Sequence, residues 1–177
     1  MDMNPSTRGA ILYSSRYGAT LQYAEWLTKE LGWPMLKAES TTQKDLASFD
    51  TLIIGSPVYI GRLLIKRWLK TNASFLGDKE LIFFIVCGTP ASERVQQESI
   101  AASNIPHELI SLTNIFFLPG RVVRNNLSWK DRLMLKIGAR LQKDPAKRAS
   151  MDRDVDEVKK EYLSPILRLV ASPLTIV

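Results

Sequence analysis

Residues 10–20 read AILYSSRYGAT, an apolar run followed at once by hydroxyl, basic and glycine residues. The run 10–13 is typical of a buried strand, and the stretch that begins near Thr20 is typical of a helix. We therefore expect a tight strand-to-helix turn between them. Free backbone N–H groups at the positive end of the helix dipole would favour a phosphate monoester in this turn.

The side chains of this turn suit the same ligand. The hydroxyl groups of Ser15 and Thr20 can donate hydrogen bonds to a phosphate, and Gly18 allows a close backbone approach. The turn contains neither G-x-x-x-x-G-K-[ST] nor G-x-G-x-x-G, which argues against a P-loop NTPase or a dinucleotide-binding fold. The alternative is a capped turn that binds nothing. The candidate cofactor-binding residues here are Ser14, Ser15, Arg16, Tyr17, Gly18, Ala19 and Thr20.

Four further apolar runs, at 34–37, 51–55, 81–86 and 115–118, alternate with helical stretches along the chain. Helical spacing recurs over 21–31, over 64–72 with a break at Asn72, over 92–103 with Ser92 as N-cap, and over 152–170. Such alternation is typical of an α/β fold with a parallel sheet. We expect residues 1–177 to form one domain, since this length can bury a sizeable core.

The composition excludes several classes of protein. The chain has 177 residues, a formal charge of +6 and 45% apolar residues, which is too apolar for a disordered chain. One Cys and one His leave no disulfide framework, and we expect no metal site. No secretory signal is visible and no run of about 18 apolar residues occurs, so we expect a cytoplasmic protein.

The positive charge is concentrated in one segment. Residues 120–148 hold nine cations and two acids, a net +7, so the remaining residues sum to −1. We interpret 120–148 as a basic insertion after the fifth strand. Within it, Ser128 to Lys143 forms a basic amphipathic helix with an apolar stripe at Trp129, Leu133, Ile137 and Leu141.

This helix has two interpretations. A basic amphipathic helix can lie peripherally on the inner face of an anionic membrane, with its apolar stripe in the headgroup region. Alternatively, the stripe packs on the sheet and the cations are solvated. Nucleic-acid binding is disfavoured, because Trp129 alone interleaves the cations and no recognised module is present.

The turn at 14–20 resembles the FMN phosphate-binding loop of flavodoxins, [ST]-x-T-G-x-T. Ser15, Gly18 and Thr20 match this pattern, whereas Tyr17 stands where the middle threonine is expected. The resemblance implies a flavodoxin-like, doubly wound, five-stranded parallel sheet of order 2-1-3-4-5. FMN would bind where the first and third strands end.

Two later turns resemble the other flavin-binding loops. The turn after Gly55 contains Ser56, Pro57, Val58, Tyr59, Ile60 and Gly61, and it resembles a ring-binding loop in which Tyr59 stacks on the isoalloxazine. Gly55 and Gly61 would let the backbone approach the ring; alternatively, Tyr59 only packs on a neighbouring loop. The turn at Cys87, Gly88 and Thr89 could present backbone donors to the pyrimidine side. The three loops contain Arg16 and no acid, which predicts a less negative reduction potential than that of an acidic carrier flavodoxin.

The region after the fifth strand, over 117–123 and 127–136, resembles that of menaquinone-dependent protoporphyrinogen oxidases. This resemblance implies an FMN-dependent oxidoreductase of heme biosynthesis that passes electrons from a reduced organic substrate to a quinone. If the substrate carries propionates, Arg121, Arg124 and Arg132 are candidates for carboxylate contacts. No residue stands out as a general acid or base. The alternatives are an electron carrier without its own substrate, with a redox protein as partner, and a domain that has lost FMN.

Overall fold

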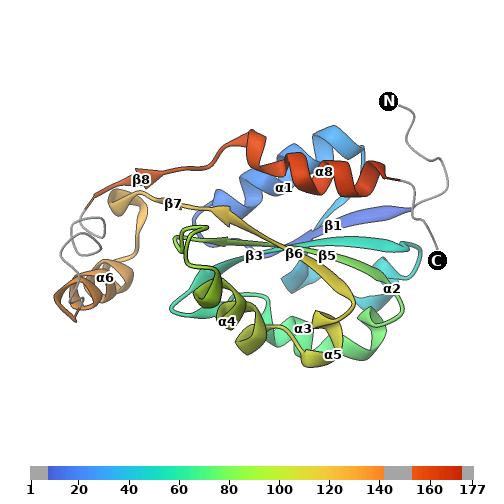
Figure 1. The fold of residues 1–177 in the computed structure, drawn as a ribbon, viewed down its shortest axis with the longest axis horizontal. Helices are drawn as coiled ribbons and strands as arrows, with labels where there is room; N and C mark the ends of the chain where they lie inside the picture. Colours follow the sequence, from blue (N-terminus) through green and yellow to red (C-terminus); the bar gives the residue numbers. More distant parts are fainter. Residues whose placement is uncertain (1–7, 142–152, 173–177) are drawn as a thin grey trace.

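Five parallel strands form the central sheet of the computed structural model, which describes residues 8–141 and 153–172 (Figure 1). The strand order is β2-β1-β3-β5-β6, which confirms the expected flavodoxin-like order. The strands are β1 (Gly9–Tyr13), β2 (Met35–Lys37), β3 (Thr51–Tyr59), β5 (Glu80–Cys87) and β6 (Thr113–Pro119).

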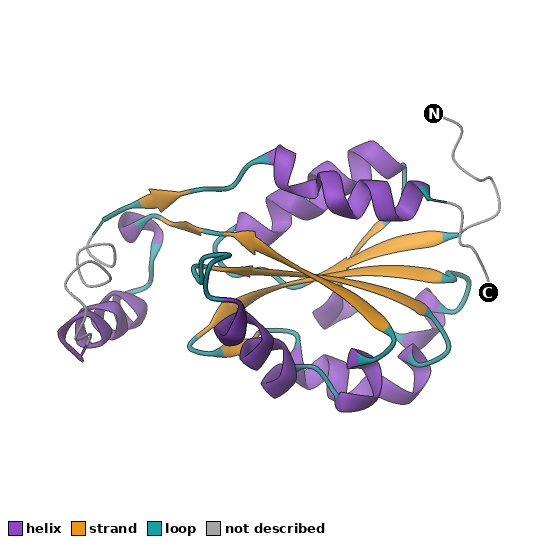
Figure 2. Ribbon diagram, in the orientation of Figure 1, coloured by secondary structure: helices purple, strands orange, loops and turns teal. Residues whose placement is uncertain are grey.

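Helices cover both faces of this sheet (Figure 2). On one face lie α1 (Ala19–Leu31), the short helix η3 (Lys160–Leu163) and α8 (Ser164–Ala171). The other face is covered by α2 (Gln43–Leu46), α3 (Lys66–Leu76), α4 (Arg94–Asn104) and α5 (His107–Ile110). The strands are apolar on both faces because each face contacts a helix layer.

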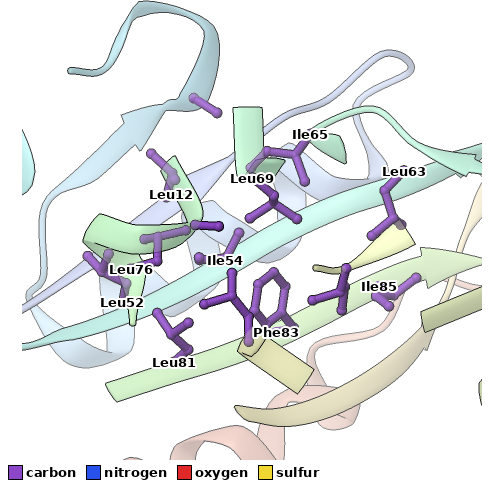
Figure 3. Close-up of a cluster of buried hydrophobic side chains, with 14 of the residues drawn as sticks. Leu12, Leu52, Ile54, Leu63, Ile65, Leu69, Leu76, Leu81, Phe83 and Ile85 are labelled. Carbon is purple, nitrogen blue, oxygen red and sulfur yellow. The ribbon is translucent and has the colours of Figure 1, made fainter. Parts of the chain in front are cut away.

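The larger core lies between the sheet and α3 (Figure 3). Strand residues Leu12, Ile54 and Phe83 pack there against Leu69 and Leu76 of α3, and all five are at most 1% exposed. Full burial of each such side chain contributes about 1.5–3 kcal/mol, so this layer fixes the strands and the positions of their carboxyl ends.

β3 is longer than the apolar run predicts. It continues through Tyr59 and then turns back into β4 (Arg62–Leu63), so residues 56–59 are strand rather than loop. β1 ends opposite Gly55, and beyond that point β3 has only β5 as its parallel neighbour. Pro57 has no N–H to donate, and because it lies beyond the end of β1, no ladder bond to β1 is lost there.

Three helix predictions need correction. Asn72 does not end a helix: α3 runs to Leu76, and the Asn72 amide donates to the Trp68 carbonyl at 2.8 Å. α4 begins at Arg94 after Glu93, without a side-chain cap from Ser92. The last helix begins only at Ser164, with Pro165 in its first turn, where a missing N–H costs nothing.

The described part of the basic insertion, residues 120–141, lies beyond the carboxyl ends of the strands, at the left of Figure 1. We call β7 (Arg121–Val122), the short helix η2 (Arg124–Asn126), α6 (Trp129–Leu141) and β8 (Val155–Asp156) the basic lobe. β8 pairs antiparallel with β7. Its residues lie near the start of the helix expected over 152–170, so this part of the chain is strand rather than helix. Residues 142–152, including Lys143, Lys147 and Arg148, lie outside the described part of the chain.

The apolar stripe of α6 is exposed. Trp129 is 68% exposed and Leu141 76%, while Leu133 and Ile137 are 49% and 43% exposed. The interpretation that this stripe packs on the sheet is therefore wrong for the part of α6 that the structure describes.

Candidate functional site

Three turns meet at the carboxyl ends of β1, β3 and β5. β1 lies between β2 and β3, so the strand order reverses between β1 and β3. Crevices at such reversals are the usual ligand sites of open parallel sheets. The backbone N–H of Ser14 donates to the Gly55 carbonyl at 3.0 Å, which joins the first turn directly to β3.

The first turn leaves donors without partners. Gly18 precedes α1 with a φ of 87°, and a Cβ atom there would meet nothing within 4 Å. The side-chain oxygens of Ser15 and Thr20 are buried and have no hydrogen-bond partner among the described residues. Buried hydroxyls are normally paired, so two hydroxyls without a described partner at a helix N-terminus fit an anionic ligand such as a phosphate.

Ser14 differs from these two hydroxyls. Its side chain is 1% exposed and donates a hydrogen bond to the carboxylate of Glu39 in the short helix η1 (Ala38–Ser40). The predicted phosphate contact of Ser14 would have to replace this bond. Its structural role is to tie the end of β1 to the segment that follows β2.

The second turn is a two-residue hairpin between β3 and β4. Tyr59 pairs with Arg62, and the residues between them, Ile60 and Gly61, have φ angles of 49° and 70°. Positive φ at both positions is the geometry of a type I′ turn. A β-branched residue rarely adopts it, so Ile60, which is 61% exposed, holds local strain beside the candidate site.

Asn104 of α4 fixes this hairpin from behind. Its Oδ1 accepts from the backbone N–H of Leu63 at 3.1 Å, and its Nδ2 donates to the carbonyls of Gly61 and Ile100 at 3.2 and 2.9 Å. The side chain is almost fully buried, so these bonds are shielded from water. Nothing in the sequence around Asn104 indicates this role, because its partners lie about forty residues earlier.

Gly55 has a packing role in the sheet. A Cβ atom at this position would lie 2.0 Å from Cζ of Phe84, so the Phe84 ring needs the space. The interpretation of Gly55 as a glycine that lets the loop approach a flavin ring is therefore wrong. Gly61 occupies the second position of the hairpin turn, where its positive φ favours glycine.

The third turn begins at Cys87, where β5 ends. Cys87 is 9% exposed, and burial raises the pKa of its thiol, which disfavours the reactive thiolate. A Cβ atom on Gly88 would meet nothing within 4 Å. The Thr89 carbonyl accepts a hydrogen bond from Gln97 of α4 at 3.1 Å, which anchors the turn to the helix layer.

An acid from the basic lobe enters this site. The Asp131 carboxylate of α6 accepts hydrogen bonds from the hydroxyls of Tyr17 and Tyr59, and from Arg16 Nη2 at 3.0 Å and Nε at 3.2 Å. The Arg16 guanidinium carbon also lies 4.2 Å from the centroid of the Tyr59 ring. Asp131 is 5% exposed, whereas the Arg16 side chain is 40% exposed, so the carboxylate is buried and the guanidinium remains partly in water.

The environment keeps Asp131 charged. Burial acts to raise its pKa, but hydrogen bonds from Tyr17, Tyr59, Arg16 and Ser128 outweigh burial and lower the pKa to about 2. The three loops themselves contain no acid, but Asp131 brings a carboxylate to them from α6, so the expectation of a less negative reduction potential loses its premise. The sequence signal near Asp131 is the Ser128-x-x-Asp131 spacing, which is typical of a helix cap. In the structure the Asp131 N–H donates to Ser128 Oγ at 3.2 Å.

The three candidate arginines for substrate carboxylates make contacts within the basic lobe. Arg121 forms an ion pair with Asp156 at 2.8 Å. The backbone N–H of Arg124 donates to Asp154 at 2.9 Å, and Arg132 Nε donates to the Leu127 carbonyl at 3.1 Å. Their role toward a substrate stays a prediction.

Comparison with known proteins gives a family. A family model described as a flavodoxin domain matches residues 10–148. No curated protein sequence matches the chain. None of the helices in the described residues is long and apolar enough to cross a membrane.

Several solved structures are similar. Oxidised flavodoxin 2 from Bacillus cereus has 16% identity and a TM-score of 0.50, over 64% of this chain and 85% of its own. Two-electron reduced flavodoxin from Megasphaera elsdenii has 19% identity and a TM-score of 0.45, over 62% and 84%. A Fusobacterium nucleatum flavodoxin variant bound to flavin mononucleotide has 12% identity and a TM-score of 0.38, over 60% and 66%.

Proposed function

The chain belongs to the flavodoxin domain family, and on that premise we propose that it is an FMN-dependent oxidoreductase with an organic substrate of its own. FMN is the cofactor of this family, and when bound it supplies the one- and two-electron chemistry. Flavodoxin-like proteins transfer electrons to redox partners. The finer proposal concerns which residues hold the flavin and what reacts with it.

The observation that carries the proposal is the pair of unpaired hydroxyls in the first turn. Ser15 and Thr20 would donate to the phosphate, together with backbone N–H groups of the turn that opens at Gly18. Tyr59 would contact the ring system from the hairpin, and the backbone of Gly88 and Thr89 would meet it from the third turn. The first turn would thus bind the phosphate of FMN, and the second and third turns would bind its ring system.

The basic lobe favours an enzyme over a carrier. It lies at the carboxyl edge of the sheet, and its helix carries the exposed cations Lys130, Arg132, Lys136 and Arg140. A cationic surface beside the cofactor attracts an anionic organic substrate. We propose a substrate with carboxylate groups, of the protoporphyrinogen type, and a quinone such as menaquinone as acceptor. The alternative is an electron carrier that serves a redox protein.

Steady-state assays with the FMN-loaded protein distinguish these two functions. The enzyme proposal expects a menaquinone analogue to be reduced when protoporphyrinogen is supplied, and not without it. A Thr20→Val variant, which loses a phosphate donor, should lose this activity in proportion to its loss of FMN. If quinone reduction requires an added flavodoxin reductase, and its rate does not depend on protoporphyrinogen, the protein is a carrier.

The exposed stripe of α6 supports a second proposal, peripheral contact with an anionic membrane. Trp129 and Leu133 would enter the headgroup region while the neighbouring cations face anionic lipids. Co-sedimentation should be stronger with vesicles containing phosphatidylglycerol than with phosphatidylcholine vesicles, and a Trp129→Ser/Leu133→Ser variant should lose the difference. Val95→Ser, at an exposed apolar site on α4 outside the basic lobe, is the matched control. Equal sedimentation of all three proteins would contradict the proposal.

A further inference from the structure

The first turn contains two pairs of groups that can bind an anion, and only one pair has an anionic partner among the described residues. The hydroxyls of Ser15 and Thr20 are buried and have no hydrogen-bond partner in the part of the chain that the structure describes. The side chains between them in sequence, Arg16 and Tyr17, are both bound to the carboxylate of Asp131. One short segment therefore holds an internal carboxylate through two of its side chains and has two further hydroxyls available to an external phosphate.

Asp131 is also a main attachment of α6 to the rest of the molecule. Its carboxylate contacts the first turn through Arg16 and Tyr17, and the hairpin through Tyr59. Much of the helix that follows is exposed, including Leu133, Met134 and Ile137. Asp131 therefore joins the basic lobe to both the first turn and the hairpin through one charged group.

The Arg16 guanidinium is paired with Asp131 and belongs to the turn in which the flavin phosphate would bind. A phosphate bound in the first turn would carry up to two negative charges beside a guanidinium already paired with Asp131, whose carboxylate is almost fully buried although the Arg16 side chain is 40% exposed. Two like-charged groups that share one cation weaken each other's binding. We propose that Asp131 and the phosphate group of the flavin compete for Arg16, so that flavin binding loosens the basic lobe and release of the lobe strengthens flavin binding.

This inference rests on the proposed FMN site, and thermodynamic linkage gives it two readouts. If the phosphate lowers the affinity of the lobe for its docked position, the docked lobe must lower the affinity for the phosphate by the same factor. The first readout is flavin affinity, and the second is the accessibility of α6. Neither readout requires catalytic activity.

The affinity experiment uses Asp131→Asn, which keeps the shape of the side chain and removes its charge. Fluorescence titrations should show FMN binding tightened by about fivefold or more, within the usual range of coupling between sites. Riboflavin lacks the phosphate, so its affinity should change much less. Asp156→Asn, in the same lobe and paired with Arg121 on β7, should leave the ratio of the two affinities unchanged. Unchanged or weaker FMN binding in Asp131→Asn would overturn the proposal, as would equal changes for FMN and riboflavin.

The accessibility experiment measures tryptic cleavage after Lys130, Arg132 and Lys136 by mass spectrometry. FMN and inorganic phosphate should both accelerate cleavage of the wild-type protein, whereas riboflavin should not. Arg16→Gln should be cleaved fast with or without phosphate, and circular dichroism checks that each variant is folded. If phosphate accelerates cleavage but no flavin binds, the competition holds and the proposed cofactor fails. If FMN binds without accelerating cleavage, the competition fails and the cofactor stands.

Discussion

Gly55 of β3 and Phe84 of β5 are paired across the sheet, and the Phe84 ring fills the space where a Cβ of Gly55 would lie. Phe84 is fully buried, and its ring also contacts the edge of the Tyr23 ring, at a centroid distance of 6.3 Å. The Phe84 ring thus contacts both α1 and β3, and it links them to β5, so the strands that carry the second and third turns share this packing. Aromatic rings packed over a glycine in a neighbouring strand are a known stabilising arrangement.

Gly55→Ala should destabilise the fold. The new methyl group would overlap Cζ of Phe84, and forcing an extra methyl into a packed core costs about 1–3 kcal/mol. Urea unfolding followed by circular dichroism measures this loss. Gly88→Ala is the control, because a Cβ atom there meets no neighbour within 4 Å, and its stability should change by no more than about 0.5 kcal/mol. Equal effects of the two substitutions would contradict the packing role.

Ile60→Asn should stabilise the protein. Asn-Gly is the preferred sequence of a type I′ turn, and Asn tolerates positive φ far better than a β-branched residue. Relief of strain at a φ of 49° should raise the free energy of unfolding by about 1 kcal/mol. Thermal melts measure the gain. Ile60→Val keeps the branched Cβ and should give none, so a gain in Ile60→Val would point to solvent exposure rather than strain.

Asn104→Ala should loosen the hairpin that carries Tyr59. It leaves the Leu63 N–H and the Gly61 carbonyl without their buried partner, at a cost of about 2–3 kcal/mol. FMN affinity should fall as well, because Tyr59 is no longer held in place. Asn104→Asp keeps the acceptor for the Leu63 N–H and loses the donor, so it tests which bond matters. Unchanged hydrogen exchange at Leu63 in Asn104→Ala would contradict the positioning role.

The fold was predictable because its signals are local. Each parallel strand is a short apolar run, and the strand-to-helix turn at 14–20 places the candidate site at the reversal of strand order. The extension of β3 was not predictable in the same way. Pro57 and two glycines are typical of a loop, and only the end of β1 opposite Gly55 explains how the strand accepts them.

The missed parts of the site depend on long-range contacts. Asp131 follows Arg16 by more than a hundred residues, and its local spacing to Ser128 indicates a helix cap alone. No local sequence pattern indicates the role of Asn104, because its partners belong to a hairpin whose residues are typical of a loop. Sequence patterns identify a turn by its own residues, whereas these two side chains reach the site from other elements.

Removing the unpaired hydroxyls should affect binding more than stability. Ser15→Ala and Thr20→Val each delete a buried oxygen without a partner among the described residues, so the free energy of unfolding of the flavin-free protein should stay the same or rise slightly. A hydrogen bond to a charged phosphate contributes about 1.5–3 kcal/mol, so each variant should bind FMN roughly tenfold or more weakly. Fluorescence titration with riboflavin is the control, and an equal loss of riboflavin affinity would place these hydroxyls elsewhere.

Asp131 should make stability dependent on pH on the acid side. Its pKa is about 2 in the folded protein, below the usual value of 3.8, so the folded state binds the proton less readily than the unfolded state. The charged carboxylate therefore contributes stability above pH 4, on the order of 2 kcal/mol, and loses it as the pH falls toward 2. The stability difference between wild type and Asp131→Asn, measured by urea unfolding, should be constant from pH 7 to 5 and shrink below pH 4. Tyr17→Phe removes one bond to the carboxylate, so it should shift this loss to higher pH. A difference that is independent of pH down to 2.5 would show that the charge of Asp131 does not hold the basic lobe.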